Sequence, residues 1–122
     1  MKLLLDTHVL IWAASAPERL SARARGAIVD ADERCVSVVS AWEYEAKRAK
    51  YPNRNAKPFD QLMAGDFLPL DFPFAAFRYA ASLPPIHADP FDRMLIAQAM
   101  EGELTLVTAD KNIRRYPVDT LW

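Results

Sequence analysis

The sequence is poor in cysteine, glycine and histidine, with one, three and two of these residues among 122. Because Cys35 is alone, it cannot form an internal disulfide, so a hydrophobic core must stabilise the chain. Cys35 lies in an apolar run, where we interpret it as a small buried side chain and not as a nucleophile. Neither histidine has a second histidine at ligand spacing, which argues against a zinc site.

A large excess of one charge is also missing. Fifteen Lys and Arg residues face sixteen Asp and Glu residues, so the net charge is −1 and the overall basic character of many nucleic-acid-binding domains is absent. No apolar run is long enough for a membrane span, and Asp6 and His8 interrupt the apolar residues 1–14, which argues against a signal peptide. We therefore expect a cytoplasmic protein with no membrane segment, in which the cysteine stays reduced.

Apolar and aromatic residues are abundant. Hydrophobic residues make up 52% of the chain, including six Phe, four Tyr and three Trp. This content is enough to bury a substantial core, and no linker, repeat or low-complexity tract divides the sequence. We expect residues 1–122 to form a single domain.

Short apolar runs alternate with amphipathic segments along the chain. The expected strands are residues 2–5, 35–39, 67–70, 104–107 and 118–121. The expected helices are residues 9–14, 22–31, 41–50, a short one at 59–63, 73–82, 90–101 and a short basic one after Asp110. This alternation is typical of an α/β fold, so we predict a three-layer α/β/α sandwich with a mainly parallel sheet.

Several side chains have an expected local role. Ser40 and Glu43 are three residues apart at the start of the 41–50 helix, in the spacing of a capping box. Trp12 and Trp42 lie in apolar helix segments and are predicted to be core residues rather than stacking platforms. Within the 73–82 helix, Phe74 and Phe77 are in register for one face.

Four acidic residues stand where predicted strands end and helices begin. Asp6 ends the first strand, Glu43 follows the second, Asp92 is in the first turn of a helix, and Asp110 follows the strand at 104–107. In a parallel sheet with crossover helices, strand ends and helix starts share one edge, where such folds bind ligands. We therefore expect the four carboxylates to converge there.

Each of these acids alone is also explained by helix capping, and Glu43 most simply so. A converging set is different, because four carboxylates repel one another unless some are protonated or a cation compensates their charge. Oxygen ligands favour a hard ion, so the sequence predicts a Mg²⁺ site, with Mn²⁺ as the alternative. The metal ligands are expected to be Asp6, Glu43, Asp92 and Asp110.

Residues near the acids could contact a substrate phosphate. The candidates are Thr7, His8, Arg93, Thr108 and Lys111. Helix N-termini at the same edge add positive partial charge that suits a phosphate oxygen. Alternatives stay open: Arg93 can pair with an acid, residues 111–115 can form a solvated face, and His8 and His87 can make polar contacts or bind metal.

Four segments together resemble a PIN domain. They are Leu-Leu-Leu-Asp-Thr-His-Val-Leu-Ile-Trp at 3–12, Ser-Ala-Trp-Glu at 40–43, His-Ala-Asp-Pro-Phe-Asp-Arg-Met-Leu-Ile-Ala-Gln-Ala at 87–99 and Thr-Ala-Asp at 108–110. More narrowly, the chain is similar to VapC-type toxins of type II toxin–antitoxin pairs. The resemblance implies that Asp6, Glu43, Asp92 and Asp110 are catalytic, with Asp6 and Asp92 as principal Mg²⁺ ligands and Asp89 as a helix cap.

The same resemblance implies an activity and partners. The activity is Mg²⁺-dependent endoribonuclease cleavage, in which metal-activated water hydrolyses an RNA phosphodiester, and the partners are a small cognate antitoxin and a second copy in a homodimer. The chain departs from its relatives after the glutamate helix, where Lys-Tyr-Pro-Asn-Arg at 50–54 replaces a Gly-Lys-Leu-like turn. The alternatives are a catalytically silent PIN-like RNA-binding or regulatory module, a phosphoaspartate receiver or phosphatase, and a DNA nuclease.

Overall fold

A computed structural model describes residues 1–52 and 56–122 of the protein. Its strands are β1 (Lys2–Leu5), β2 (Glu33–Ser37), β3 (Leu68–Leu70), β4 (Thr105–Val107) and β5 (Thr120–Leu121). They form one sheet in the order β3-β2-β1-β4-β5, and every neighbouring pair is parallel. The predicted parallel α/β architecture is confirmed, with β1 at the centre.

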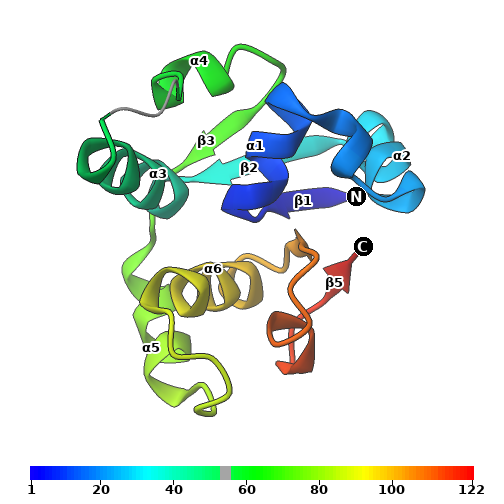
Figure 1. The fold of residues 1–122 in the computed structure, drawn as a ribbon. Helices are drawn as coiled ribbons and strands as arrows, with labels where there is room; N and C mark the ends of the chain where they lie inside the picture. Colours follow the sequence, from blue (N-terminus) through cyan, green and yellow to red (C-terminus); the bar gives the residue numbers. More distant parts are fainter. Residues whose placement is uncertain (53–55) are drawn as a thin grey trace.

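Helices cover both faces of this sheet. They are α1 (Thr7–Ser15), α2 (Ala22–Asp30), α3 (Val38–Lys50), α4 (Phe59–Leu62), α5 (Phe74–Ser82) and α6 (Pro90–Glu101), with 3₁₀ turns η1 (Pro17–Arg19) and η2 (Ile113–Arg115). In Figure 1, α1, α2 and α4 are seen in the upper part of the molecule and α5 and α6 in the lower part, and residues of α1, α2 and α4 pack in one core while residues of α6 pack in the other. Helix α3 packs against α1, α4 and α6, so it lines the end of the sheet between the two layers.

The residues of β1 explain the layers. Leu3, Leu4 and Leu5 are all fully buried, and successive side chains in a strand point to opposite faces. Leu3 and Leu5 pack in the core that contains Leu10 of α1, whereas Leu4 packs in the core that contains Leu95 of α6. A strand buried on both faces has to be apolar throughout, as this one is. Each such leucine contributes about 1.5–3 kcal/mol through burial.

Cys35 on β2 belongs to the same core as Leu4 and is free and 1% exposed, as expected. Burial raises the pKa of its thiol above the ordinary value. A buried thiol with a raised pKa carries little thiolate, which is the reactive form. The structure therefore supports the packing role of Cys35.

The start of α3 differs from the prediction. Strand β2 ends at Ser37, whose Oγ accepts a hydrogen bond from the backbone N–H of Val39 at 3.0 Å, so Ser37 is the cap. Ser40, the predicted cap, lies inside the helix and is fully buried. Residues 38–39 are helical and do not extend the strand as predicted, because a short apolar run fits either element. Without Ser40 as cap there is no capping box, and Glu43 stands in the second turn.

Aromatic residues on α3 and α5 are less buried than predicted. Trp42 is 67% exposed and Phe74 is 92% exposed, whereas Ala76 is the fully buried residue of α5. Helix α5 therefore packs on α6 through small residues, which let the two helices approach closely. Trp12 is partly buried beside Trp122, with ring centroids 5.8 Å apart, so its predicted packing against the core is confirmed.

The predicted loop between the third helix and the third strand lies partly outside the described residues. Residues 53–55, and with them much of the 50–54 departure from the family pattern, are not among those described. The short helix expected at 59–63 is present as α4. Among residues 1–52 and 56–122, no helix has both the length and the apolar character that a membrane crossing requires.

Candidate metal centre

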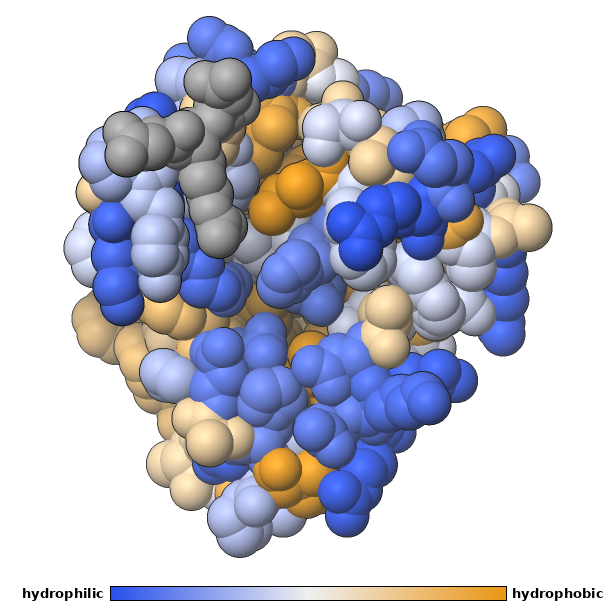
Figure 2. Space-filling model, in the orientation of Figure 1, coloured by the Kyte–Doolittle hydropathy of each residue, from blue (hydrophilic) through white to orange (hydrophobic). Residues whose placement is uncertain are grey.

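The four predicted acids line one pocket at the carboxyl edge of the sheet. Asp6 connects β1 to α1, Glu43 lies on α3, Asp92 on α6, and Asp110 in the segment after β4. The pocket has a volume of about 330 Å³ and is also lined by His8, Trp12, Lys47, Asp89 and Ala109. Figure 2 shows hydrophilic side chains gathered across the centre and lower part of this face. The predicted convergence therefore exists.

Asp6 is held in place by a hydrogen bond from the neighbouring strand. Its carboxylate is only 6% exposed, and Oδ2 accepts a hydrogen bond from Thr108 Oγ1 at 2.8 Å. Burial raises the pKa of Asp6, and the Thr108 hydroxyl and the charge of His8 oppose that rise. Although Asp6 precedes α1, its side chain makes no capping hydrogen bond. Capping therefore does not account for this acid.

Glu43 is bound on both carboxylate oxygens. Oε1 accepts from Thr7 Oγ1 at 2.8 Å, and Thr7 Oγ1 also lies 2.9 Å from Ser40 Oγ. Oε2 pairs with Lys47 Nζ at 2.8 Å, one helical turn further along α3. Glu43 is 3% exposed, so Lys47 supplies positive charge to a buried carboxylate. Sequence reasoning overlooked Lys47, although its i,i+4 spacing from Glu43 was a visible signal.

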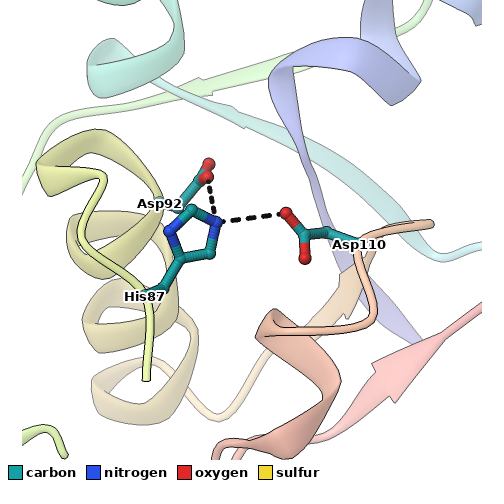
Figure 3. Close-up of side chains that lie close together, drawn as sticks. All are labelled: His87, Asp92 and Asp110. Carbon is teal, nitrogen blue, oxygen red and sulfur yellow. Dashed lines mark hydrogen bonds and ion pairs between the residues drawn. The ribbon is translucent and has the colours of Figure 1, made fainter. Parts of the chain in front are cut away.

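His87 links the other two acids. It lies in the loop between α5 and α6, and its Nε2 is 3.0 Å from Asp92 Oδ2 and 3.1 Å from Asp110 Oδ2. Figure 3 shows the imidazole ring between the two carboxylates, which come from α6 and from the segment after β4. The sequence left two roles open for His87, a polar contact or metal binding. The structure shows polar contacts with two carboxylates of the site.

The environment of Asp92 favours a protonated acid in the absence of a cation. Its pKa is raised to about 7, first by burial and then by the negative charges of Asp6, Asp89 and Glu43, while His87 lowers it. Repulsion of this kind is expected where several carboxylates converge, and the ammonium of Lys47 is paired with Glu43. A divalent ion in the pocket would remove this cost.

Asp110 serves the local turn and the site together. Its Oδ1 accepts the backbone N–H groups of Asn112 at 2.7 Å and Ile113 at 3.3 Å, while its Oδ2 faces His87. Burial raises the pKa of Asp110, but these hydrogen bonds outweigh burial and leave that pKa lowered. Asp110 therefore remains ionised where Asp92 tends to hold its proton.

Asp89 caps α6, as the sequence predicted. Its Oδ1 accepts the backbone N–H of Phe91 at 2.8 Å and of Asp92 at 3.3 Å, and Pro90 occupies the first helical position. The cap fixes the first turn of α6 and with it the direction of Asp92. Asp89 thus adds negative charge beside the site.

The predicted phosphate contacts fall into two groups. Thr7 and Thr108 are buried and donate to Glu43 and Asp6, and the guanidinium of Arg93 donates to backbone carbonyls of the α5–α6 loop. These hydrogen bonds give all three a structural role, Arg93 meets carbonyls rather than an acid, and the contact with a phosphate stays a prediction. His8 and Lys111 are exposed, and His8 lines the pocket.

The donor atoms suit a hard divalent ion. One carboxylate oxygen each from Asp92 and Asp110 lie within 4.8 Å of one another, and the carboxylates of Asp6 and Glu43 line the same pocket. Mg²⁺ and Mn²⁺ prefer such oxygen-rich surroundings. Burial raises the pKa values of Asp6 and Asp92, and neighbouring carboxylates add to both increases, so a cation bound among these groups would favour their ionised forms. The residues therefore fit a divalent cation.

Comparison with known protein families places the chain in one of them. Residues 3–119 match the PIN domain family, so this chain belongs to the PIN-domain family. The chain is also similar to ribonuclease VapC22 of Mycobacterium tuberculosis strain ATCC 25618 / H37Rv. The two are 34% identical over 128 residues, covering 98% of this chain and 97% of that protein.

Solved structures share the fold. A crystal structure of VapBC2 from Rickettsia felis bound to a promoter DNA fragment gives a TM-score of 0.78 at 16% identity, covering 100% of this chain and 99% of that chain. DNA-bound VapBC from Salmonella typhimurium gives 0.71 at 19% identity, covering 99% and 97%. FitAcB from Neisseria gonorrhoeae gives 0.60 at 20% identity, covering 98% and 96%. These similarities establish the fold and carry no information about the acidic site.

Proposed function

We propose that this protein is a Mg²⁺-dependent endoribonuclease that acts as the toxin of a toxin–antitoxin pair. The observation that carries the proposal is a pocket lined by four carboxylates, in which Asp6 and Asp92 have raised pKa values that a divalent cation would relieve. Membership of the PIN family and the 34% identity to a ribonuclease support the nuclease activity.

Each acid has a proposed part in binding the ion. Asp6 and Asp92 hold it, and Glu43 and Asp110 complete its surroundings directly or through water. When bound, Mg²⁺, or Mn²⁺ in its place, would activate water and stabilise charge on the phosphate under attack. Thr108 keeps Asp6 oriented toward the pocket by donating to its Oδ2.

Cations at the pocket are placed to meet the backbone of a nucleic acid. Lys47 Nζ pairs with Glu43 while its side chain is 57% exposed, so it can also face an incoming phosphate. His8 lines the pocket, and Lys111 is exposed next to Asp110. We propose that these three bind substrate phosphates, which would concentrate positive charge locally in a chain of net charge −1.

The rival functions fit less well. A silent PIN-like module is expected to lack at least one acid, whereas all four line this pocket. A phosphoaspartate receiver needs its phosphorylated aspartate at a strand end and a partner lysine after a later strand, and the position of Asp92 at the start of α6 does not fit that arrangement. DNA cleavage is separated from RNA cleavage by the test below.

Activity assays with the purified protein test the proposal. RNA and DNA of the same sequence are incubated with Mg²⁺, with Mn²⁺ or with EDTA, using wild type, Asp6→Asn and Asp92→Asn. We expect RNA cleavage with either metal, none with EDTA, and a loss of at least 100-fold in folded variants, in line with removal of a principal metal ligand. Full Mg²⁺-dependent activity in either folded variant would overturn the assignment of the acids.

The proposed partners are a small cognate antitoxin, which the VapC resemblance implies, and a second copy of the chain. For the second copy the candidate surface is an apolar groove between α3, α5 and α6, lined by Val38, Val39, Trp42, Phe72, Phe74, Phe77, Phe91 and Met94. Burial of the exposed aromatic rings of this groove against a second copy would stabilise the dimer, because it removes apolar surface from water. The buried free thiol of Cys35 fits a reducing compartment, so we propose the cytoplasm as the location.

A further inference from the structure

His87 has a different hydrogen-bond partner on each ring nitrogen. Nδ1 lies 3.1 Å from the backbone nitrogen of Asp89, and that N–H group can only donate. On the other side of the ring, Nε2 faces the Oδ2 atoms of Asp92 and Asp110. The two contacts together define the tautomer of the ring, since neutral imidazole has one donor and one acceptor.

A nitrogen that accepts a hydrogen bond carries no proton. Because Nδ1 accepts from Asp89, the proton of the neutral ring must be on Nε2, where it points at the two carboxylates. His87 therefore donates one N–H between Asp92 and Asp110. Its Nε2 lone pair is part of the ring π-system in this tautomer, so it is not available to bind a cation.

The backbone of the His87 loop is clamped by a tyrosine and an arginine. The N–H of His87 donates to Tyr116 Oη at 2.7 Å, and Tyr116 Oη donates to the carbonyl of Pro84 at 2.9 Å. Arg93 donates to the carbonyls of Pro84 and Leu83 at 2.9 and 3.1 Å and to Tyr116 Oη at 3.3 Å. Tyr116 is 4% exposed, so this clamp is part of the core.

The clamp joins the same two elements that the ring bridges. Arg93 follows Asp92 on α6, and Tyr116 belongs to the segment that begins with Asp110. Within that segment the N–H of Arg114 donates to the carbonyl of Asp110. A shift of the loop would therefore disturb the ring and both acids together.

We propose that His87 is a positioning residue of the metal centre. Tyr116 and Arg93 hold His87, which donates its Nε2–H to Asp92 and Asp110. This donation keeps the two carboxylates side by side and directed into the pocket. His87 itself is not a ligand of the ion. The inference rests on the proposed function for the presence of a divalent ion. Hydrogen-bonding partners of metal ligands typically change metal affinity by about 10–100-fold when they are removed.

Nitrogen NMR of the metal-free protein tests the tautomer. In ¹⁵N-labelled wild type at a single, slightly alkaline pH, we expect His87 to show a protonated Nε2 and an unprotonated Nδ1. The resonances are assigned by their loss in His87→Gln. Any form with a proton on Nδ1 would overturn the inference, and this result does not depend on nuclease activity or on metal.

Binding of Mn²⁺ tests the positioning role. In His87→Phe, which keeps a ring but has no N–H donor, we expect the affinity for Mn²⁺ to fall about 10–100-fold. In His87→Gln, whose amide can donate to both carboxylates, we expect most of that affinity to return. In Tyr116→Phe the affinity for Mn²⁺ should fall by a smaller factor. The matched control is Tyr79→Phe, at a partly exposed tyrosine on α5, and it should bind Mn²⁺ as wild type does.

Pulsed EPR of the Mn²⁺ complex separates donation from ligation. With ¹⁵N-labelled wild type, we expect no coupling from a directly bound His87 nitrogen. A histidine coupling that is present in wild type and lost in His87→Gln would show that His87 is a ligand and would overturn the inference, whereas a coupling that persists in His87→Gln would come from His8, which lines the same pocket. Equal affinity in wild type and folded His87→Phe would overturn it too, as would a His87→Gln variant as weak as His87→Phe. If wild type itself binds no divalent ion, the proposed function fails instead.

Discussion

Thr108 and Asp6 are 102 positions apart in the sequence, and the hydroxyl of Thr108 donates to Asp6 Oδ2 at 2.8 Å. They meet because β1 and β4 are neighbours in the sheet, where the N–H of Asp6 also donates to the carbonyl of Val107. The carboxylate is thus anchored by the strand beside it, in a position where burial raises its pKa.

Thr108→Val should destabilise the folded protein. The substitution keeps the shape of the side chain but leaves a buried carboxylate without its donor, at a cost of about 1–3 kcal/mol. Urea unfolding in EDTA at neutral pH measures the change in the free energy of unfolding. Thr105→Val, in the same strand, is the matched control and should stay within about 0.5 kcal/mol of wild type. A Thr108→Val protein as stable as wild type would contradict the anchoring role.

The pKa of Asp92 predicts how stability changes with pH in the absence of metal. The folded protein holds the Asp92 proton up to about pH 7, whereas the unfolded chain releases it near the ordinary value of 3.8. Unfolding therefore releases a proton between these values, so metal-free wild type should lose stability as pH rises from about 4 to 7. With about 1.4 kcal/mol per pKa unit, the loss is at most about 4 kcal/mol.

Asp92→Asn is the comparison for this pH effect. Since the variant has no proton to lose at this position, its unfolding free energy in EDTA should fall less between pH 4 and 7, and it should exceed wild type at the upper end. In wild type, the affinity for Mg²⁺ should rise across the same window because the ion displaces the proton. Calorimetry in two buffers of different ionisation enthalpy measures that proton release, and its absence would contradict the prediction.

Lys47→Met should separate metal binding from substrate binding. Loss of the ammonium removes a competitor for the Glu43 carboxylate, so affinity for Mg²⁺ should be unchanged or tighter. If Lys47 also meets a phosphate, KM for RNA should rise roughly 10-fold, about 1.4 kcal/mol of lost binding. Lys50→Met, in the last turn of the same helix, is the matched control. Parallel loss of Mg²⁺ affinity and of substrate binding would show that Lys47 acts on the carboxylate alone.

A charge in the apolar groove should prevent pairing of two copies. Phe74 is 92% exposed and Trp42 is 67% exposed, so Phe74→Glu or Trp42→Glu should leave the fold intact. Burial of an unpaired carboxylate in the interface would then disfavour the dimer. Sedimentation velocity measures the oligomeric state, and Val29→Glu on α2, with 67% exposure, is the control. A dimer that persists in both groove variants would place the interface elsewhere.

Much of the site followed from local sequence patterns. Asp6 after an apolar strand, Asp92 in a helix start capped by Asp89, and Asp110 after another strand were identifiable because the ends of parallel strands share an edge. The start of α3 was not, because Ser37 and Ser40 are both good caps and their apolar neighbours fit a strand or a helix. With Ser37 as the cap, Glu43 stands in the second turn of α3, which leaves its predicted place at the pocket and removes its predicted part in a capping box.

Periodicity and turn residues act over a few neighbouring positions, so the alternation of strands and helices and the kinds of ligand at one edge could be predicted from local patterns. The three-dimensional packing was needed to show which hydroxyl binds Asp6, that Lys47 pairs with Glu43, that Tyr116 and Arg93 hold the His87 loop, and that Phe74 faces solvent. Those outcomes depend on distances between segments far apart in the chain. Packing sets such distances, and on α5 it buries Ala76 and leaves Phe74 exposed.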